Sequence, residues 1–411
     1  MPSATPSDSD EPDEPEEPRL LTRDFLLVLA TQLAFGFAFS SFFLLPKFVV
    51  TELHGTPSQV GYVGALAVVT AVLASPLTGR LLDRGPRRPL LLAGTVLSAL
   101  ASFAFLGVSE LGLYLYAARA LQGLAATLFF VSAGTLVADL APPARLGQAL
   151  GLWGSASLLM NAVATLIAES IAYDFGWSGV FAIAGAAGVV AVLLALLVRE
   201  PPRRHEVTAP LASPFAIIRE RLPALWAGVA GGAAFGVMFT FTPPFALSLG
   251  DVHVSPLFAG YTASALGIRL LFGNLADRVG RARVGGAALG FYTLVVAGTA
   301  FLAPGWLGVL GLAFGLAHGA YYPSVNALAL EGASHQQRGT ISAYFNAAFN
   351  AGVLLVTFCF GQVAQAFGYP TIFVMVAVIT ATGCPLLLGQ IRRKSWLVRP
   401  HLQPRGQSPA E

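Results

Sequence analysis

Apolar stretches of roughly 20 residues recur along the chain, and this length is what an α-helix needs to cross a bilayer. The spans of a membrane β-barrel would be shorter and would alternate in polarity, which these stretches do not. Only 11% of the residues are charged, against about 25% in an ordinary soluble domain. The sequence therefore predicts an all-α integral membrane protein.

The apolar stretches and the residues that interrupt them predict twelve transmembrane helices. An even number of spans places both ends of the chain on the same side of the membrane. The expected ranges are 24–50, 57–81, 87–108, 111–138, 146–171, 177–198, 223–248, 255–276, 283–303, 305–331, 338–365 and 369–391.

The positions of the basic residues predict the orientation. Of the 24 Lys and Arg residues, 21 fall in segments on the side of the chain ends. The loops of the opposite side hold only Lys47, and Arg119 and Arg269 lie within spans. Since basic residues accumulate in cytoplasmic segments, both termini are expected in the cytoplasm. The net charge of +3 is thus a topology signal and does not indicate a nucleic-acid partner.

Composition divides the chain into five parts. No basic segment precedes the first apolar stretch, so it is expected to be a retained span and not a cleaved signal peptide. The expected parts are a disordered acidic cytoplasmic tail at 1–22, an N-terminal six-helix half at 23–198, a cytoplasmic linker at 199–222, a C-terminal six-helix half at 223–391 and a basic cytoplasmic tail at 392–411.

A short charged segment occurs twice, once in each half. The segment from Gly273 to Arg281 has an imperfect copy 194 residues earlier, from Gly79 to Arg88. Two related six-helix units in the same orientation are typical of a transporter that rocks around a site between its halves. The expected conformational latch consists of Gly79, Asp83, Arg84, Arg87 and Arg88 in the first copy and Gly273, Asp277, Arg278, Gly280 and Arg281 in the second.

These residues resemble the major facilitator superfamily over essentially all of 20–392. The family pattern Gly-x-x-x-Asp-Arg-x-Gly-Arg is complete in the second copy, whereas the first copy has Pro86 in place of the second glycine. The segment from Arg119 to Gly123 is similar to the Arg-x-x-Gln-Gly motif of the fourth span. The resemblance implies a major facilitator fold in which Asp83 and Asp277 help to hold the cytoplasmic ends together when the transporter faces outward.

Within the superfamily, the chain looks most similar to bacterial drug and sugar efflux permeases. Antiporters of that group usually carry Gly-Pro-x-x-Gly-Gly in the fifth span. Here the corresponding positions are Ala164, Thr165, Ala168 and Glu169, which departs from the antiporter pattern.

Two arginines lie within spans, where a cation is costly unless it faces water or a partner. Arg119 has no acid within one helical turn, so it is a candidate for binding an anionic substrate or for sensing proton movement. The alternative is that it extends to the outer surface. For Arg269, a structural role near the cytoplasmic end is expected.

Two titratable side chains are candidates for proton coupling. His318 lies in the middle of the tenth span and titrates near physiological pH, and Glu169 lies towards the outer end of the fifth. The alternatives are a hydrogen-bonded packing role for His318 and an interfacial position for Glu169. Uncharged polar residues in the spans can hydrogen-bond either a substrate or neighbouring helices. With Arg119 and His318, the candidate cavity residues are Gln32, Gln122, Asn161, Tyr322, Asn326, Asn346 and Asn350.

No phosphate-binding loop, metal-ligand spacing or nucleophile constellation occurs, so neither an enzyme nor a cofactor is expected. The expected function is secondary transport of a small organic solute by a monomer in the bacterial inner membrane, with proton-coupled efflux of a drug-like compound or metabolite favoured. The alternatives are an uptake permease or uncoupled facilitator, and a membrane receptor or scaffold without transport. The expected partners are the substrate, the lipid bilayer and protons.

Overall fold

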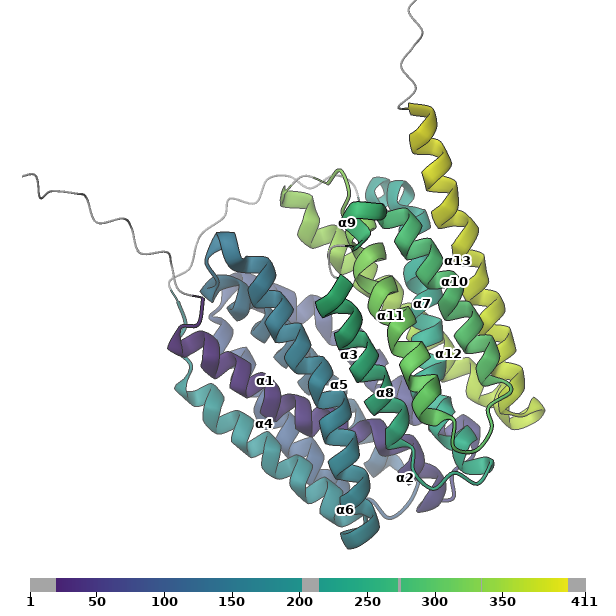
Figure 1. Ribbon diagram of the computed structural model, residues 1–411. Coiled ribbons are helices and arrows are strands. Elements are labelled where there is room, and N and C mark those ends of the chain that lie inside the picture. The colour runs from purple at the N-terminus through teal and green to yellow at the C-terminus, as the bar shows by residue number, and fades with distance from the viewer. Residues whose placement is uncertain (1–19, 202–213, 273–274, 334, 398–411) are drawn as a thin grey trace, which may run out of the picture.

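The computed structural model describes residues 20–201, 214–272, 275–333 and 335–397. Within these ranges the secondary structure is helical and contains no strand. A membrane-spanning chain has to satisfy its backbone N–H and C=O groups internally, and an α-helix does so within each segment. The helices form two bundles that lie side by side (Figure 1).

The N-terminal bundle contains residues 23–197 and is called the N-terminal half below. Its first crossing is built from three consecutive helical pieces, α1, η1 and α2. The bounds are α1 Arg23–Ser41, η1 Phe42–Leu44, α2 Leu45–Thr51, α3 Pro57–Arg84, α4 Arg87–Ala104, η2 Phe105–Gly107, α5 Leu113–Leu140, η3 Pro143–Arg145 and α6 Leu146–Leu197.

The C-terminal bundle contains residues 214–397 and is called the C-terminal half. The short α9 lies between two long helices, in the second copy of the charged segment. The bounds are α7 Pro214–Ser248, α8 Ser255–Phe272, α9 Leu275–Val279, α10 Arg281–Thr299, α11 Leu307–Ala329, α12 His335–Phe367 and α13 Tyr369–Leu397.

Within the described ranges, eight helical segments are long and apolar enough to cross a membrane. One of them, Pro143–Leu197, covers 55 residues, which is more than twice the length that one crossing requires. Its backbone leaves helical geometry at Gly176, where φ is 72° and ψ is 178°. This left-handed φ suits glycine, and it separates α6 into two successive helices.

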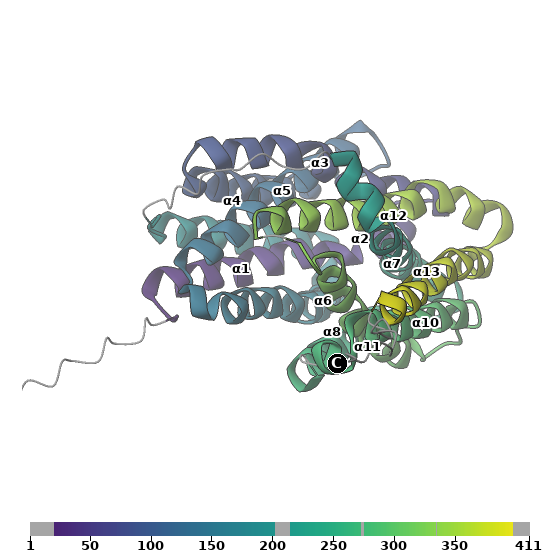
Figure 2. The ribbon, with the colours of Figure 1, turned by 90° about the horizontal axis from the view of Figure 1, so that it is seen from above.

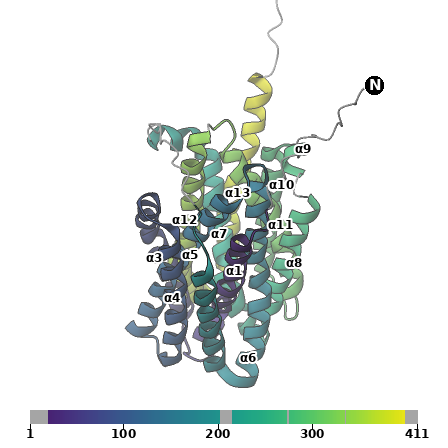
Figure 3. The same cartoon turned by 90° about the vertical axis from the view of Figure 1, so that its left-hand side faces the viewer.

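The turns between helices lie at two opposite ends of the molecule. One end, called the termini side, holds the start of α1, the turn at Gly85 and the end of α13. The other end, called the distal side, holds the turns at Gly55, Gly176, Gly250 and Gly368. Figures 2 and 3 show the two halves from above and from one side.

Several helix bounds differ from the ranges expected from sequence, most clearly at the start of α7 and at the end of α13. Helix α7 begins at Pro214, inside the segment 199–222 that was expected to be a linker. Proline suits the first turn of a helix because the N–H it lacks would have no helical partner there. Helix α13 extends to Leu397, so it runs beyond the expected boundary at 391.

Glycines allow helices of the same half to approach closely. A Cβ atom at Gly352 of α12 would collide with the carbonyl oxygen of Val229 and lie 2.7 Å from the backbone nitrogen of Ala233, both in α7. A Cβ atom at Gly94 of α4 would lie 2.6 Å from the backbone nitrogen of Phe129 in α5. Apolar lipid provides no hydrophobic drive for helix association, so this close van der Waals packing stabilises each half.

We predict that Gly352→Val lowers the thermal stability of the purified protein. The added side chain overpacks the contact between α7 and α12, a change that typically costs about 1–3 kcal/mol. The measurement is the Tm in detergent. The matched control is Gly339→Val in the same helix, where a Cβ atom meets nothing within 4 Å. Equal Tm values for the two variants would show that the α7–α12 contact does not limit stability.

Candidate functional site

A buried ion pair of the N-terminal half contacts the C-terminal half on the distal side. Lys47 Nζ of α2 lies 2.6 Å from Glu169 Oε1 of α6, and the Glu169 side chain is only 3% exposed. The carboxylate also accepts hydrogen bonds from the backbone N–H groups of Val254 and Ser255, each at 2.8 Å, where α8 begins. We call Lys47, Glu169, Val254 and Ser255 the distal cluster.

The distal cluster has favourable electrostatics for an ionised carboxylate. The positive end of the α8 dipole and two backbone donors face Glu169, and Lys47 supplies a full positive charge. Lys47 also donates to the carbonyl oxygen of Val252 at 2.6 Å, so it too contacts both halves. The imidazole of His253 lies at the edge, with its Nδ1 3.9 Å from Glu169 Oε2.

Helices α3 and α12 extend this distal contact between the halves. A Cβ atom at Gly361 would lie 2.7 Å from the carbonyl oxygen of Pro57, so the two backbones touch there. Gln362 Nε2 donates to the Tyr62 hydroxyl at 2.8 Å. Phe43 of the N-terminal half packs edge-on against Phe239 of α7, with ring centroids 5.1 Å apart.

Towards the termini side, α3, α6, α8 and α12 each have a glycine with open space around it. Gly79 in α3, Gly147 in α6, Gly267 in α8 and Gly339 in α12 each have nothing within 4 Å of an added Cβ atom. The hydrogen bonds and ring contacts described between the halves lie at or towards the distal side.

His318 of α11 lies inside a group of aromatic rings in the C-terminal half. It is 6% exposed, and its Nδ1 is 2.9 Å from the Tyr261 hydroxyl. Its Nε2 is buried and has no hydrogen-bond partner among the described residues. We call His318 and the rings around it the aromatic cage. Their centroids lie 5.1–6.4 Å from the His318 ring and belong to Phe235, Tyr261, Tyr292, Phe314, Tyr321, Tyr322 and Phe349.

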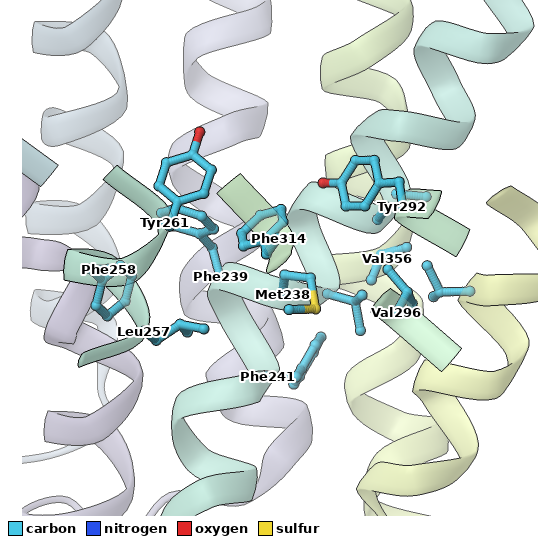
Figure 4. Close-up of a cluster of buried hydrophobic side chains, with 14 of the residues drawn as sticks. Met238, Phe239, Phe241, Leu257, Phe258, Tyr261, Tyr292, Val296, Phe314 and Val356 are labelled. Atoms are coloured by element: carbon cyan, nitrogen blue, oxygen red, sulfur yellow. The ribbon is translucent and has the colours of Figure 1, made fainter. Parts of the chain in front are cut away.

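The aromatic cage has a buried side and a partly exposed side. Tyr292 and Phe314 are fully buried, and Figure 4 shows them beside Tyr261 and Phe239 in the apolar core. Phe235, Tyr322 and Phe349 are partly exposed. The His318 ring therefore lies at the edge of the core.

The predicted cavity residues on α11 and α12 form part of a hydrogen-bonded chain. The Tyr322 hydroxyl donates to Asn346 Oδ1 at 2.6 Å, and Asn350 Nδ2 donates to the carbonyl oxygen of Asn346 at 2.9 Å. This places Asn346 and Asn350 together beside Tyr322 of the aromatic cage. Asn326, one turn further along α11, has a buried Oδ1 without a described partner.

The predicted cavity residues of α1 and α6 pair with each other's helix. Gln32 Nε2 donates to the Ser157 hydroxyl at 3.0 Å, and the Ser40 hydroxyl donates to Asn161 Oδ1 at 2.9 Å. Both bonds fall along the extensive packing of α1 against α6. Gln32 is fully buried, so its contact is with a neighbouring helix.

Arg119 of α5 binds neutral acceptors. Its Nη1 donates to Gln122 Oε1 at 2.8 Å, and its Nε donates to the carbonyl oxygen of Val63 in α3 at 3.2 Å. No acidic side chain within the described ranges pairs with it. The structure thus brings Arg119 and Gln122 together within the N-terminal half.

Arginines of the expected latch make contacts within their own half. Arg87 Nε lies 2.9 Å from Asp139 Oδ2, and Arg281 Nη1 donates to the carbonyl oxygen of Ala327 at 3.4 Å. Gly280 has a φ of 109°, which only glycine adopts readily. Gly273 and the side chains of Asp83 and Asp277 lie outside the part of the chain that the structure describes.

The sequence did not identify the partners of Glu169 and His318. Lys47 served only to predict the topology, although a single basic residue on the distal side indicates that it has an acidic partner there. The aromatic cage combines rings from five helices, and no local pattern connects them. Within the described residues, no group of three or more His, Cys, Asp or Glu side chains is placed to hold a metal ion.

Comparisons with known proteins agree with this architecture. The chain is 28% identical over 365 residues to the multidrug resistance protein MdtG of Serratia proteamaculans, covering 84% of this chain and 88% of that protein. It is 27% identical to the protein of the same name from Erwinia billingiae, with the same coverage.

Two solved structures share the fold at low sequence identity. The nucleoside transporter NupG aligns with a TM-score of 0.72 and 15% identity, covering 90% of this chain and 100% of that one. A bacterial homologue of the human lysosomal transporter Spinster, in an inward-facing and unoccupied conformation, aligns with a TM-score of 0.70 and 17% identity, covering 90% of this chain and 96% of that one.

The family model of the Major Facilitator Superfamily matches residues 26–357 and 251–409, which together cover nearly the whole chain. This match agrees with the apolar helices and with the fold of the solved transporters. The protein is therefore a multi-pass membrane protein that belongs to the major facilitator superfamily, a family of transporters and not of enzymes.

Proposed function

We propose that this protein is a twelve-span secondary transporter that exports a small organic compound by alternating access, in exchange for protons. The observation that carries the proposal is the one-sided contact between the halves. Among the described residues, the hydrogen bonds between the halves lie at or towards the distal side, as at Glu169, Lys47 and Gln362. This asymmetry is what one state of an alternating-access cycle requires.

Twelve crossings follow from the eight apolar segments if one of them counts twice and three further helices are added. Pro143–Leu197 counts as two crossings because it breaks at Gly176, and α8, α10 and α11 have 18, 19 and 23 residues. The excess of basic residues at the termini side supports a cytoplasmic location for that side. The bacterial MdtG relatives support the inner membrane of a bacterium.

We predict that a reporter fused after Glu411 is active only when the reporter works in the cytoplasm. In Escherichia coli, a green fluorescent protein fusion should fluoresce and an alkaline phosphatase fusion should be inactive. As a control, alkaline phosphatase fused after Gly250, on the distal side, should be active. An active phosphatase at the C-terminus would reverse the proposed orientation.

The halves are proposed to rock about the central region of the molecule. Opening the distal side has to separate Glu169 from the α8 N-terminus and Lys47 from the carbonyl oxygen of Val252. Closing the termini side would bring together the two charged segments, Gly79–Arg88 and Gly273–Arg281, which we propose act as the conformational latch. Since one chain supplies both halves, a monomer suffices.

Glu169 is proposed to link proton binding to this motion. The ionised carboxylate pairs with Lys47 and with two N–H donors, and His253 Nδ1 lies 3.9 Å from Glu169 Oε2. A protonated carboxyl is a weaker acceptor for the N–H groups of Val254 and Ser255, which belong to the other half, so proton binding and distal opening favour each other by linkage. For net inward movement, the proton has to pass to a group that faces the other side, and we assign this relay to His318.

The names of the relatives support efflux as the direction. Both MdtG proteins are named for multidrug resistance. The likeness to NupG, at 15% identity, supports the fold only. Uptake or uncoupled diffusion by the same halves is the alternative, and the direction of gradient-driven flux separates these functions. A receptor or scaffold would produce no flux.

We predict that Glu169→Gln abolishes proton-driven transport. Gln cannot carry the charge that pairs with Lys47, and loss of one partner of a buried ion pair costs about 3–5 kcal/mol. In proteoliposomes loaded with a panel of organic solutes, flux driven by an imposed pH gradient should fall at least about tenfold. His318→Gln should likewise lose the response to the gradient.

The matched control is Glu110→Gln, which removes an exposed acid on the distal side and should leave the flux unchanged. Wild-type flux that ignores the pH gradient would overturn the proton coupling and leave a facilitator. Gradient-driven accumulation in the opposite direction would indicate uptake.

A further inference from the structure

The interior of the spans carries unbalanced positive charge. Among the described residues, the acids other than Glu169 lie at helix ends or in turns, and Glu169 is paired with Lys47. Arg119 and Arg269 lie within α5 and α8 without a described acidic partner. An ionisable side chain inside a membrane is costly, so such a residue marks a functional site by default.

Arg269 lies beside the aromatic cage. Helix α8 packs along α11, and a Cβ atom at Gly319 would lie 2.6 Å from Ile268 Cγ2. The residue before Arg269 therefore contacts the residue after His318. Arg269 itself lies about two turns after Tyr261 of the aromatic cage in the same helix. Its Nε is buried and has no described partner, which leaves one N–H donor free.

His318 offers a second free donor in the same place. A phenol hydroxyl is a good donor, so we assign the 2.9 Å bond as Tyr261 donating to Nδ1 of the imidazole. The proton of the neutral ring then lies on Nε2, which has no described partner. An unpaired buried N–H group is unfavourable, and an acceptor atom of a ligand would satisfy it.

The partly exposed rings supply an apolar surface next to these donors. Phe235 and Phe349 lie 5.6 Å apart, and Tyr322 packs edge-on against Phe349 at 5.3 Å. Aromatic faces and edges at such distances suit a further aromatic ring in stacked or edge-on contact. The surface belongs to α7, α11 and α12.

We propose that the aromatic cage and Arg269 form the substrate site, and that its substrates are planar aromatic compounds with an anionic group such as a carboxylate or sulfonate. The ring of the substrate packs against Phe235, Tyr322 and Phe349. Its anionic group accepts from Arg269 and from Nε2 of His318. An organic cation would meet Arg269 without a described acid to balance its charge. This inference names the substrate class of the proposed transport function and rests on it.

Binding to the purified full-length protein tests the charge preference. Isothermal titration calorimetry in detergent would compare three probes with the same ring system: naphthoate, naphthylmethanol and naphthylmethylamine, which are anionic, neutral and cationic at neutral pH. Naphthoate should bind about tenfold or more tightly than the amine. This comparison needs no variant, so it holds even if a substitution impairs folding.

The variant Arg269→Gln should weaken naphthoate binding about tenfold and leave naphthylmethanol binding within about twofold. The control Arg283→Gln removes the same charge from an exposed position of α10 and should change neither affinity. Equal or tighter binding of the amine by the wild-type protein, or unchanged naphthoate binding by Arg269→Gln, would overturn the inference.

The failure of this inference is distinguishable from failure of the proposed function. Gradient-driven flux of naphthylmethylamine without binding of naphthoate would reject the anionic substrate and retain the transporter. No flux of any solute in the panel would reject the transporter itself.

Discussion

The exclusion of water from the spans is the constraint on which the structure depends. Without water, each backbone N–H and C=O needs a partner inside the protein, and long helices provide these partners. The hydrophobic effect then contributes little to holding one helix against another. Close contact takes its place, as at Gly352, where backbone meets backbone between α12 and α7.

The same constraint makes each charged group inside the spans conspicuous. Glu169 is accommodated because Lys47 and the N-terminal N–H groups of α8 surround its carboxylate. Lys47 belongs to the N-terminal half and the N–H groups belong to the C-terminal half. The contacts that stabilise the buried charge therefore also connect the halves. Arg119 and Arg269 have no such acidic partner among the described residues, and Arg119 donates to neutral acceptors instead.

In the C-terminal half, the buried core also positions the polar side chain of His318. The aromatic cage joins a fully buried core, including Tyr292 and Phe314, to rings that are partly exposed. His318 lies at the boundary and uses one nitrogen within the core, while the other remains unpaired. The buried core can therefore orient a polar atom at its own edge.

The sequence by itself determined the membrane-spanning helices, the duplicated halves and the family, because these depend on apolar length, repeat spacing and short motifs. It also identified Glu169 and His318 as unusual side chains. Tertiary structure decided what surrounds them. Lys47 lies 122 positions from Glu169, and Tyr261 lies 57 positions from His318. Partners so distant in sequence are set by helix packing, for which a single chain carries no local signal.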